Sequence, residues 1–377
     1  MHIIAQKSTL LSAILPSLKA VAKTTANPVL ETFMLKAVKG DAESSLIITG
    51  YDLEKGIKCV IPAIVKEEGQ ILVSSSRLSA IVNNLPDGNV EITTDDKLKV
   101  KITAANSLFE IAGLATDVFP TLPELRGDRK FGISQGLLKR MTRQTCFAAS
   151  TIDTKPFMTG LYFVIRDKKI KIVGCDGYRL ALREEPLDFE SEQTDLDFIV
   201  PAKTMINLAD ILEDSEEPVN IQLTRKHIIF FTQDFIFFSR LIEGEYLDYE
   251  RAMPKDPTIF LKVNLPDVIE SINRVALIVD QKAKSPVRCF VAPKMLKMTC
   301  ISALGSVNDE IEAETEGNEI DLEIGFNHIF LKDAFERARD CGEDCVNIEM
   351  TSAQTGILIK PLSGNHFLYF ILPVRLQ

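Results

Sequence analysis

Several residues and motifs that usually mark an enzyme are missing from this chain of 377 residues. It has no tryptophan and only four histidines, at positions 2, 227, 328 and 366, which stand isolated in the sequence. No Gly-Lys-Ser/Thr triplet, HExxH, GxSxG or glycine-rich dinucleotide turn occurs. These absences argue against common nucleotide-binding, metallopeptidase and hydrolase sites. They also favour structural or exposed histidines over catalytic ones.

Membrane, secretory and disulfide features are missing as well. No run approaches the ~20 uncharged residues of a spanning helix, and no basic segment followed by an apolar one opens the chain. The seven cysteines are scattered and odd in number, which favours buried thiols in a reducing cytoplasm. Cys341 and Cys345 form only one pair of zinc ligands, so we expect neither a metal nor a cofactor.

The chain does contain a threefold repeat. Residues 3–11, 131–138 and 261–269 each change from an extended pattern to a helical one, and their apolar pairs at 10/11, 137/138 and 268/269 are 127 and 131 residues apart. Residues 73–78, 200–205 and 326–331 are also strand-to-helix transitions, spaced by 127 and 126 residues. Two independent landmarks with one period predict three tandem copies of one domain.

Each copy has the pattern of an α+β domain, with two helices on one face of antiparallel sheets built from about eight strands. We predict helices at 7–23, 74–85, 135–148, 201–212, 264–277 and 327–340, with a kink at Pro16. Turn signals such as Pro86-Asp87-Gly88-Asn89 separate the strands. The predicted domains are 1–124, 125–254 and 255–377.

Positive charge is concentrated in the predicted helices. The segments 7–23 and 135–148 each carry three bases and no acid, and the six segments together carry +6. The whole chain carries −10, so the remainder carries −16. A solvated basic face explains one such helix. Two of them favour helices that form a positive surface able to hold nucleic acid through phosphates, without reading its sequence.

Three functions remain open on these residues alone. The first is a non-enzymatic protein that holds duplex DNA without reading its sequence. The second is an enzyme that uses Asp176 and Arg179, although no spacing supplies a base and a nucleophile. The third is a repeat scaffold that binds proteins but not DNA, which the acidic net charge favours.

Sequence motifs along the whole chain resemble one family. They are Gly174-Cys175-Asp176-Gly177-Tyr178-Arg179-Leu180, Arg240-Leu241-Ile242-Glu243-Gly244, Glu323-Ile324-Gly325-Phe326-Asn327 and the terminal Leu372-Pro373-Val374-Arg375-Leu376. In this order and register the sequence resembles the bacterial replicative sliding clamp, the beta subunit of DNA polymerase III. The resemblance implies a head-to-tail homodimer whose six domains close a ring around DNA, with no catalytic activity.

The family also has a peptide-docking groove between the second and third domains, which receives short motifs of polymerases, the clamp loader and repair proteins. The resemblance assigns it to these positions: Met158, Cys175, Gly177, Tyr178, Arg179, Leu180, Leu247, Arg251, Ala252, Asn327, Phe330, Phe370, Leu372, Pro373, Val374, Arg375 and Leu376. Leu247 replaces a frequent proline, Tyr178 replaces a frequent histidine, and Gln377 extends past the usual terminal leucine.

The resemblance also assigns the DNA-facing bases and the dimer contacts. The expected DNA-binding residues are Lys19, Lys23, Arg77, Lys139, Arg140, Arg143, Lys155 and Lys203. The expected apolar contacts between protomers are Phe109, Ile111, Leu277 and Ile278. An apolar edge strand left uncovered is prone to aggregation, so pairing it across an interface is physically reasonable.

Overall fold

The computed structural model describes residues 1–40, 43–152, 154–187, 195–280, 282, 285–317 and 321–376. Gln377, which we predicted to extend the C-terminal wall of the groove, lies outside the described residues. Contacts divide the chain into two compact units. Unit 1 contains residues 1–135 and 210–241, and unit 2 contains residues 136–209 and 242–376, in each case the described residues only.

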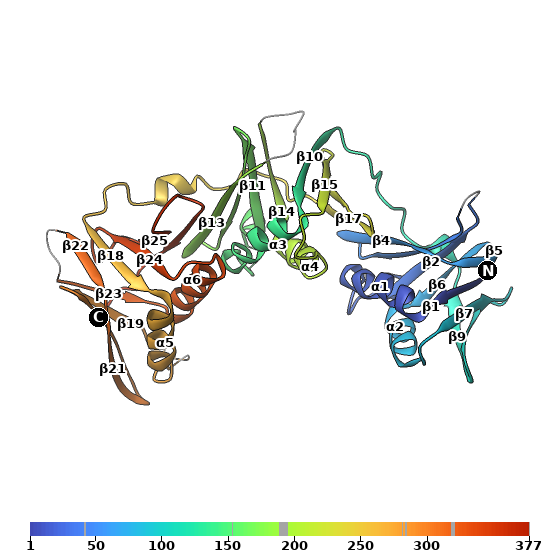
Figure 1. Ribbon diagram of the computed structural model, residues 1–377, viewed down its shortest axis with the longest axis horizontal. Coiled ribbons are helices and arrows are strands. Elements are labelled where there is room, and N and C mark those ends of the chain that lie inside the picture. The colour runs from blue at the N-terminus through green and yellow to red at the C-terminus, as the bar shows by residue number, and fades with distance from the viewer. Residues whose placement is uncertain are drawn as a thin grey trace. The chain divides into compact units, whose positions relative to one another are not determined.

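The first repeat lies in unit 1 and contains α1 (Lys7–Ser17) and α2 (Ser75–Asn84), drawn in blue in Figure 1. Its strands are β1 (His2–Gln6), β2 (Thr32–Val38), β3 (Ser45–Tyr51), β4 (Lys55–Pro62), β5 (Ile64–Glu67), β6 (Gly69–Ser74), β7 (Asn89–Thr94), β8 (Lys99–Ala104) and β9 (Ser107–Leu114). Its 3₁₀ turns are η1 (Leu18–Ala20), η2 (Pro28–Glu31) and η3 (Thr116–Val118).

The second repeat contains α3 (Gln135–Arg143) and α4 (Ala202–Ala209). Its strands are β10 (Arg129–Ser134), β11 (Gly160–Arg166), β12 (Lys169–Cys175), β13 (Arg179–Pro186), β14 (Leu196–Pro201), β15 (Pro218–Leu223), β16 (His227–Phe231) and β17 (Phe235–Arg240). Its 3₁₀ turns are η4 (Cys146–Ala148), η5 (Pro156–Thr159) and η6 (Tyr249–Ala252). The strands β10 and β15–β17 belong to unit 1, whereas β11–β14 belong to unit 2.

The third repeat lies in unit 2 and contains α5 (Leu265–Ala276) and α6 (His328–Asp340). Its strands are β18 (Ile259–Asn264), β19 (Val287–Ala292), β20 (Met295–Ser302), β21 (Gly305–Glu312), β22 (Glu314–Gly317), β23 (Leu322–Phe326), β24 (Cys345–Met350), β25 (Ile357–Pro361) and β26 (Phe367–Ile371). The predicted α+β class with three copies of one domain is confirmed.

Two antiparallel ladders join consecutive repeats. In unit 1, β17 pairs with β4, so strands of the first two repeats share one sheet. In unit 2, β13 pairs with β26 and does the same for the second and third repeats. We call the β4–β17 ladder the first junction and the β13–β26 ladder the second junction.

The predicted strand-to-helix transitions have the same backbone geometry in all three repeats. The amide N–H groups of Lys7, Gln135 and Leu265 donate at 2.9, 2.9 and 2.8 Å to the carbonyl oxygen of the residue just before a later strand, namely Gly88, Glu217 and Asp344. The side chain of Asn264 caps α5 by accepting from the Asp267 N–H, with a proline in the first turn. These residues satisfy amide groups that a helix start leaves unpaired.

The helices are shorter than the hydrophobic periodicity predicted. The segment predicted at 7–23 is α-helical only to Ser17 and continues as the 3₁₀ turn η1, just after Pro16. The segment predicted at 135–148 likewise ends at Arg143, before η4. A proline removes a helical hydrogen bond and crowds the preceding turn, which accounts for the early end of α1.

The apolar faces of paired helices form the core of the third repeat. The α5 residues Leu265, Val268 and Ile272 are fully buried, and they belong to one cluster with Leu331 and Phe335 of α6. Burying a side chain of this size contributes about 2 kcal/mol. The sheets therefore hold the helices rigidly, and the outward faces of the helices remain available for contacts.

Candidate functional site

The hairpin between β12 and β13 is held by a network around Arg179. Asp176 Oδ1 accepts the N–H groups of Tyr178 and Arg179, both at 2.9 Å. The Arg179 guanidinium pairs with Asp176 Oδ2 at 3.1 Å and with Asp333 Oδ2 of α6 at 2.5 Å. Both side chains therefore have structural partners, which argues against Asp176 and Arg179 as catalytic residues.

Two aromatic rings complete the surroundings of Arg179. Its guanidinium carbon lies 4.5 Å from the centre of the Phe330 ring and 5.4 Å from that of Phe147. A guanidinium between carboxylates and ring faces is strongly fixed. Arg179 and Phe330, both predicted groove residues, thus hold the hairpin on α6 and define the position of its exposed tip.

The predicted floor of the groove is buried. Met158, Cys175, Leu180 and Phe370 are 3–8% exposed. Cys175, Leu180 and Phe370 share an apolar cluster with Tyr249, against which Tyr246, Leu247 and Met253 pack. Burial raises the pKa of the Cys175 thiol, and its sulfur accepts the Gly177 N–H at 3.3 Å. The floor is therefore an apolar support beneath the connecting segment 246–253.

The exposed part of the predicted groove lies along the C-terminal tail, residues 372–376. The Leu372 N–H donates to the Tyr178 carbonyl at 2.9 Å, and the Val374 N–H donates to the Gly325 carbonyl at 2.8 Å. Tyr178, Leu372 and Val374 are 66, 36 and 40% exposed. The tail thus presents apolar side chains to solvent while its backbone is fixed at Leu372 and Val374.

Val374 borders two cavities. One has a volume of about 420 Å³ and is lined by Val279, Ser285, Pro286, Phe326, Asn327, His328, Ile329 and Val374. The other has a volume of about 670 Å³ and is lined by Glu323, Ile324, Gly325, Ala353, Gln354 and the tail itself. The smaller cavity has a mainly apolar lining and the larger one a mixed lining, and cavities of this size suit side chains of a docked ligand.

Other predicted groove residues lie at the margin. Arg251 is exposed and pairs with Asp248 at 2.7 Å, and the neighbouring Ala252 is exposed too. The Asn327 side chain caps α6 by accepting the Ile329 N–H at 3.0 Å. Pro373, Arg375 and Leu376 line the larger cavity.

The sequence analysis missed several residues that line the smaller cavity. Val279, Pro286 and Ile329 belong to it, and Ile329 is 46% exposed. An exposed apolar residue in the first turn of α6, directly after the Asn327 cap, is the signal that could have indicated it.

The predicted DNA-binding bases lie on or beside the helices. Lys23, Arg77, Arg140, Arg143 and Lys203 are exposed, and Lys139 is half-buried. Lys19 pairs with Asp210 at 2.7 Å within unit 1. Lys7, counted among the bases of the first helix, pairs with Asp87 at 3.2 Å. The positive charge of the segment 7–23 is therefore partly neutralised by acids outside that segment.

Lys155 lies next to the predicted groove. Its carbonyl accepts the Met158 N–H at 2.9 Å, and its charge acts on the Cys175 thiol, opposing the effect of burial on the pKa. Its assignment to DNA stays a prediction.

The predicted dimer contacts lie on an edge strand and after a helix. Phe109 is 39% exposed and Ile111 is half-buried, both on β9 of unit 1. Leu277, just after α5 of unit 2, is 77% exposed, and Ile278 follows it. Burial of these side chains requires a surface that the described chain does not itself supply.

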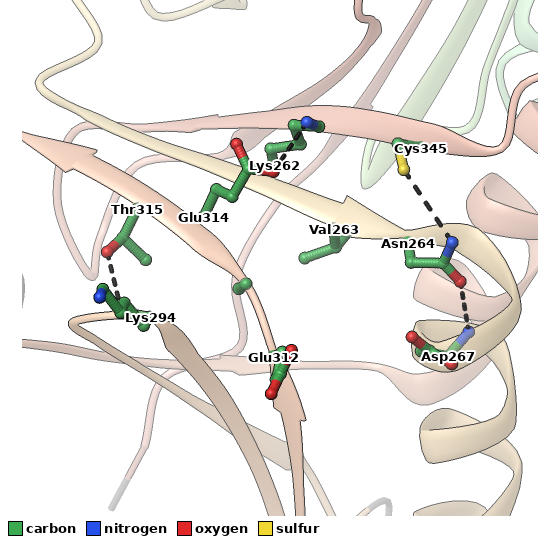
Figure 2. Close-up of a pocket in the computed structure, with 10 residues that line it drawn as sticks. Lys262, Val263, Asn264, Asp267, Lys294, Glu312, Glu314, Thr315 and Cys345 are labelled. Atoms are coloured by element: carbon green, nitrogen blue, oxygen red, sulfur yellow. Dashed lines mark hydrogen bonds and ion pairs between the residues drawn. The ribbon is translucent and has the colours of Figure 1, made fainter.

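A further cavity of about 570 Å³ lies at the start of α5 (Figure 2). Its polar groups satisfy one another: Lys262 Nζ pairs with Glu314 at 2.8 Å, and the Lys294 N–H donates to Thr315 Oγ1 at 3.1 Å. Cys345 lines this cavity, whereas the Cys341 thiol contacts the Arg337 carbonyl and the Tyr369 hydroxyl. The structure thus places the two cysteines in different surroundings.

The described part of the chain has neither a group of side chains suited to a metal ion nor a helix suited to span a membrane. No group of three or more histidine, cysteine or acidic side chains is arranged to hold a metal ion there. Among the helices that the structure describes, none is long and apolar enough to cross a membrane.

Family comparisons agree with this architecture. Models of the DNA polymerase III beta subunit match residues 1–123 for the N-terminal domain, 132–248 for the central domain and 250–375 for the C-terminal domain. Three such α+β domains in one chain define a protein with the fold of a DNA clamp. The chain belongs to the family of DNA polymerase III beta subunits.

Individual relatives extend over the full length. The beta sliding clamp of Staphylococcus epidermidis is 30% identical over 370 residues, which is 95% of each chain. The crystal structure of the Bacillus subtilis DNA polymerase sliding clamp superposes with a TM-score of 0.94 at 28% identity, covering all of both chains. A putative DNA polymerase III beta subunit from Eubacterium rectale has a TM-score of 0.93 at 30% identity, again over both whole chains.

Proposed function

We propose that two copies of this chain form a ring that encircles duplex DNA and serves as a processivity factor without catalytic activity. The observation that carries the proposal is the basic surface of α3, which holds Lys139, Arg140 and Arg143 and no acid. Bases opposite phosphates bind any sequence through release of counterions. Closed topology then retains the ring on DNA, so individual contacts can stay weak enough for sliding.

The test compares retention on a nicked circular plasmid with retention on the same plasmid after linearisation, following loading by the cognate clamp loader and ATP. Stable retention on the circle that is lost through free ends supports the ring. Equal retention on both forms would mean ordinary electrostatic binding. No retention on either, with a loader of verified activity, would favour the scaffold that binds only proteins.

Charge reversal distinguishes the effect of the basic surface of α3 on retention from the effect of the overall net charge. Lys139, Arg140 and Arg143 changed together to glutamate should abolish retention on the circle. The matched control changes three exposed turn lysines, Lys97, Lys168 and Lys226, to glutamate, which alters the net charge equally. Equal loss in both variants would show that only net charge matters.

We further propose that the tail and its two cavities dock short peptides of the replicative polymerase, the clamp loader and repair proteins. Support comes from the exposed apolar side chains of a fixed tail, with cavities of about 420 and 670 Å³ beside Val374. In such grooves a few buried anchors supply most of the affinity. A chain with seven free thiols suits the cytoplasm, where these partners act.

Peptide docking is tested with a fluorescein-labelled clamp-binding peptide from the cognate polymerase. Val374→Asp should weaken binding at least about tenfold, because it places a charge between the two apolar cavities. Leu362→Asp is the control, since Leu362 is 44% exposed, close to the 40% of Val374, and does not line either cavity. Unaltered affinity of Val374→Asp would exclude the tail as the docking site.

A further inference from the structure

One side chain of the connecting segment, Tyr246, packs on the floor of the predicted groove. Its ring contacts the apolar cluster that contains the buried residues Cys175, Leu180 and Phe370. The same ring stacks on Tyr162, with ring centres 4.8 Å apart and an angle of 7° between the planes. Tyr246 therefore helps to cover the residues that the groove would offer to a docked peptide.

The hydroxyl of Tyr246 is buried without a partner. Its oxygen makes no hydrogen bond with any residue that the structure describes. Burial, and then the neighbouring Cys175 thiol, raise the pKa of this hydroxyl; the Cys175 backbone opposes the increase, but it lies outside hydrogen-bond geometry. A buried polar group without a partner raises the free energy of the state that contains it. Moving the hydroxyl to polar surroundings would therefore be favourable.

A polar cavity borders the same ring. Its volume is about 450 Å³, and it is lined by Tyr162, Val164, Arg166, Asp167, Lys169, Lys171, Glu184 and residues 246–250. The Lys171 ammonium lies 3.5 Å from the Glu184 carboxylate. An ammonium donates and a carboxylate accepts, so either group can pair with a phenol hydroxyl. The cavity thus offers both room for the Tyr246 ring and partners for its oxygen.

The backbone around Tyr246 is loosely held. The Ile242 N–H donates to the Ile199 carbonyl at 2.9 Å, but the N–H groups of residues 243–248 donate to no backbone carbonyl in the described part of the chain. Gly244 has a φ of 126°, a conformation that glycine adopts without strain. Segments with few backbone hydrogen bonds open locally at low cost, and small residues serve as their hinges.

The first junction provides a contrasting tyrosine. Tyr51 packs on a ring of its ladder as well, but it belongs to β3 and pairs with Gly56 in the sheet. Its hydroxyl donates to the Leu53 carbonyl at 3.4 Å. Tyr51 is therefore fixed by its strand and has a partner for its oxygen, whereas Tyr246 lies on an irregular segment and has none.

We infer that Tyr246 is a plug with two positions, which decides when the groove can be occupied. In the closed position its ring packs on the groove floor around Cys175. In the open position the ring lies in the cavity of about 450 Å³, its hydroxyl meets polar groups, and the floor is free for an apolar side chain. This inference rests on the peptide docking proposed above. Because only molecules with an open plug bind, the apparent affinity is reduced by the fraction that is open.

Alkylation of Cys175 by iodoacetamide, followed by mass spectrometry, measures the plug without a peptide. Tyr246→Phe removes the hydroxyl that has no partner and so favours the closed position, which should slow labelling at least about fivefold. Tyr246→Ala removes the ring, and labelling should become at least about tenfold faster. Cys289, a buried thiol of the third repeat, should label equally slowly in every variant, which shows that the fold is intact. Unchanged labelling of Cys175 in Tyr246→Phe would overturn the plug.

Titration with the fluorescein-labelled peptide of the cognate polymerase connects the plug to docking. Tyr246→Phe should bind the peptide at least about fivefold more weakly than the unmodified chain. Tyr51→Phe is the matched control, because it removes the hydroxyl of the fixed tyrosine, and its affinity should be unchanged.

The two measurements distinguish failure of the plug from failure of docking. Equal peptide affinity in the unmodified chain, Tyr246→Phe and Tyr51→Phe would leave the docking proposal intact and overturn the plug. If Cys175 labelling responds as expected but none of the three proteins binds the peptide, the two positions of Tyr246 are supported and the docking proposal is wrong.

Discussion

The two junctions within the chain share a backbone ladder but differ in the side chains that cover it. In the first junction Tyr51 packs on Phe238, with ring centres 5.6 Å apart. The equivalent residues of the second junction are Cys175 and Phe370, because Tyr51 faces Gly56 as Cys175 faces Leu180. A thiol fills far less space than a phenol ring, so the second ladder has no aromatic ring of its own at the position of Tyr51.

The connecting segments make up the difference. At the first junction Phe119, Leu122 and Leu125 pack on a small cluster that already contains both rings. At the second junction Tyr246 and Tyr249 of the connecting segment supply the aromatic rings, and burial raises the pKa of both hydroxyls. The comparison shows two ways to cover the apolar face of such a ladder. Aromatic residues of the ladder itself cover the first, and a connecting segment that also forms the rim of the candidate groove covers the second.

The largest effect is expected from removing an aromatic ring at the centre of a ladder. Phe237→Ala should lower the free energy of unfolding by about 4 kcal/mol, because the ring is fully buried and leaves a cavity. Phe109→Ala removes a half-exposed ring from β9 and should cost less than about 1 kcal/mol in dilute solution. Urea denaturation of both variants measures these losses, and equal losses would contradict the difference in burial between the two rings.

Removing the buried ion pair of a hairpin, Lys55–Asp52 or Arg179–Asp176, should have the next largest effect. Arg179→Ala leaves Asp176 and Asp333 without their cation, so we expect a loss of about 3 kcal/mol. Lys55→Ala should cost about 2 kcal/mol, since the Asp52 carboxylate still accepts two backbone N–H groups. Arg251→Ala breaks an exposed pair of the same spacing and should cost under about 1 kcal/mol. The measurement is thermal and urea unfolding. Loss of the exposed pair lowering the free energy of unfolding as much as loss of either buried pair would refute this ranking.

Exchanging the residues that distinguish the junctions sharpens the comparison. Tyr51→Cys should destabilise unit 1 by about 2 kcal/mol, because Phe238 loses its neighbouring ring. Cys175→Tyr should cost about 1–3 kcal/mol through overpacking beneath Tyr246 and Tyr249. It should also weaken binding of the labelled peptide by displacing the rim. Normal peptide affinity in a folded Cys175→Tyr variant would show that the rim, residues 246–253, is not part of the docking site.

The smallest effect concerns pH. Burial, followed by the charge of Arg183, lowers the pKa of His366 below its usual 6.5, although Glu343 and Glu185 oppose this. Burial and then Arg240 lower the pKa of His227, near the first junction. The unfolded histidines bind protons first, so stability is complete above about pH 6.5 and decreases as the pH falls toward the folded pKa values. His227→Gln and His366→Gln should each flatten this decline in urea titrations between pH 7.5 and 5.5, and an unchanged slope would show that neither histidine contributes.

Local patterns predicted the repeat and the types of its elements. The transitions at 7, 135 and 265 follow from the change between alternating and helical apolar spacing. Helix ends were overestimated at 18–23 and 144–148, because apolar spacing continues through 3₁₀ turns that share the buried face.

The junctions lay beyond the reach of sequence patterns. β17 and β4 are about 180 residues apart, and their pairing depends on two sheet edges that meet only in the folded chain. The same applies to the pair of Lys19 with Asp210 and to the contact of Arg179 with the Phe330 ring, since each joins residues of two different repeats. Burial of Cys175 and Leu180 also depends on the segment 246–253, which has no regular apolar spacing.

The C-terminal tail continues directly from β26, and this has a mechanical consequence. A bound partner that pulls on residues 372–376 loads the second junction along its strands. Its five residue pairs then resist together in shear, whereas a pull across the strands would unzip them one at a time. Under the docking proposed above, a partner that pulls on the tail would therefore load this sheet in the direction in which it resists best.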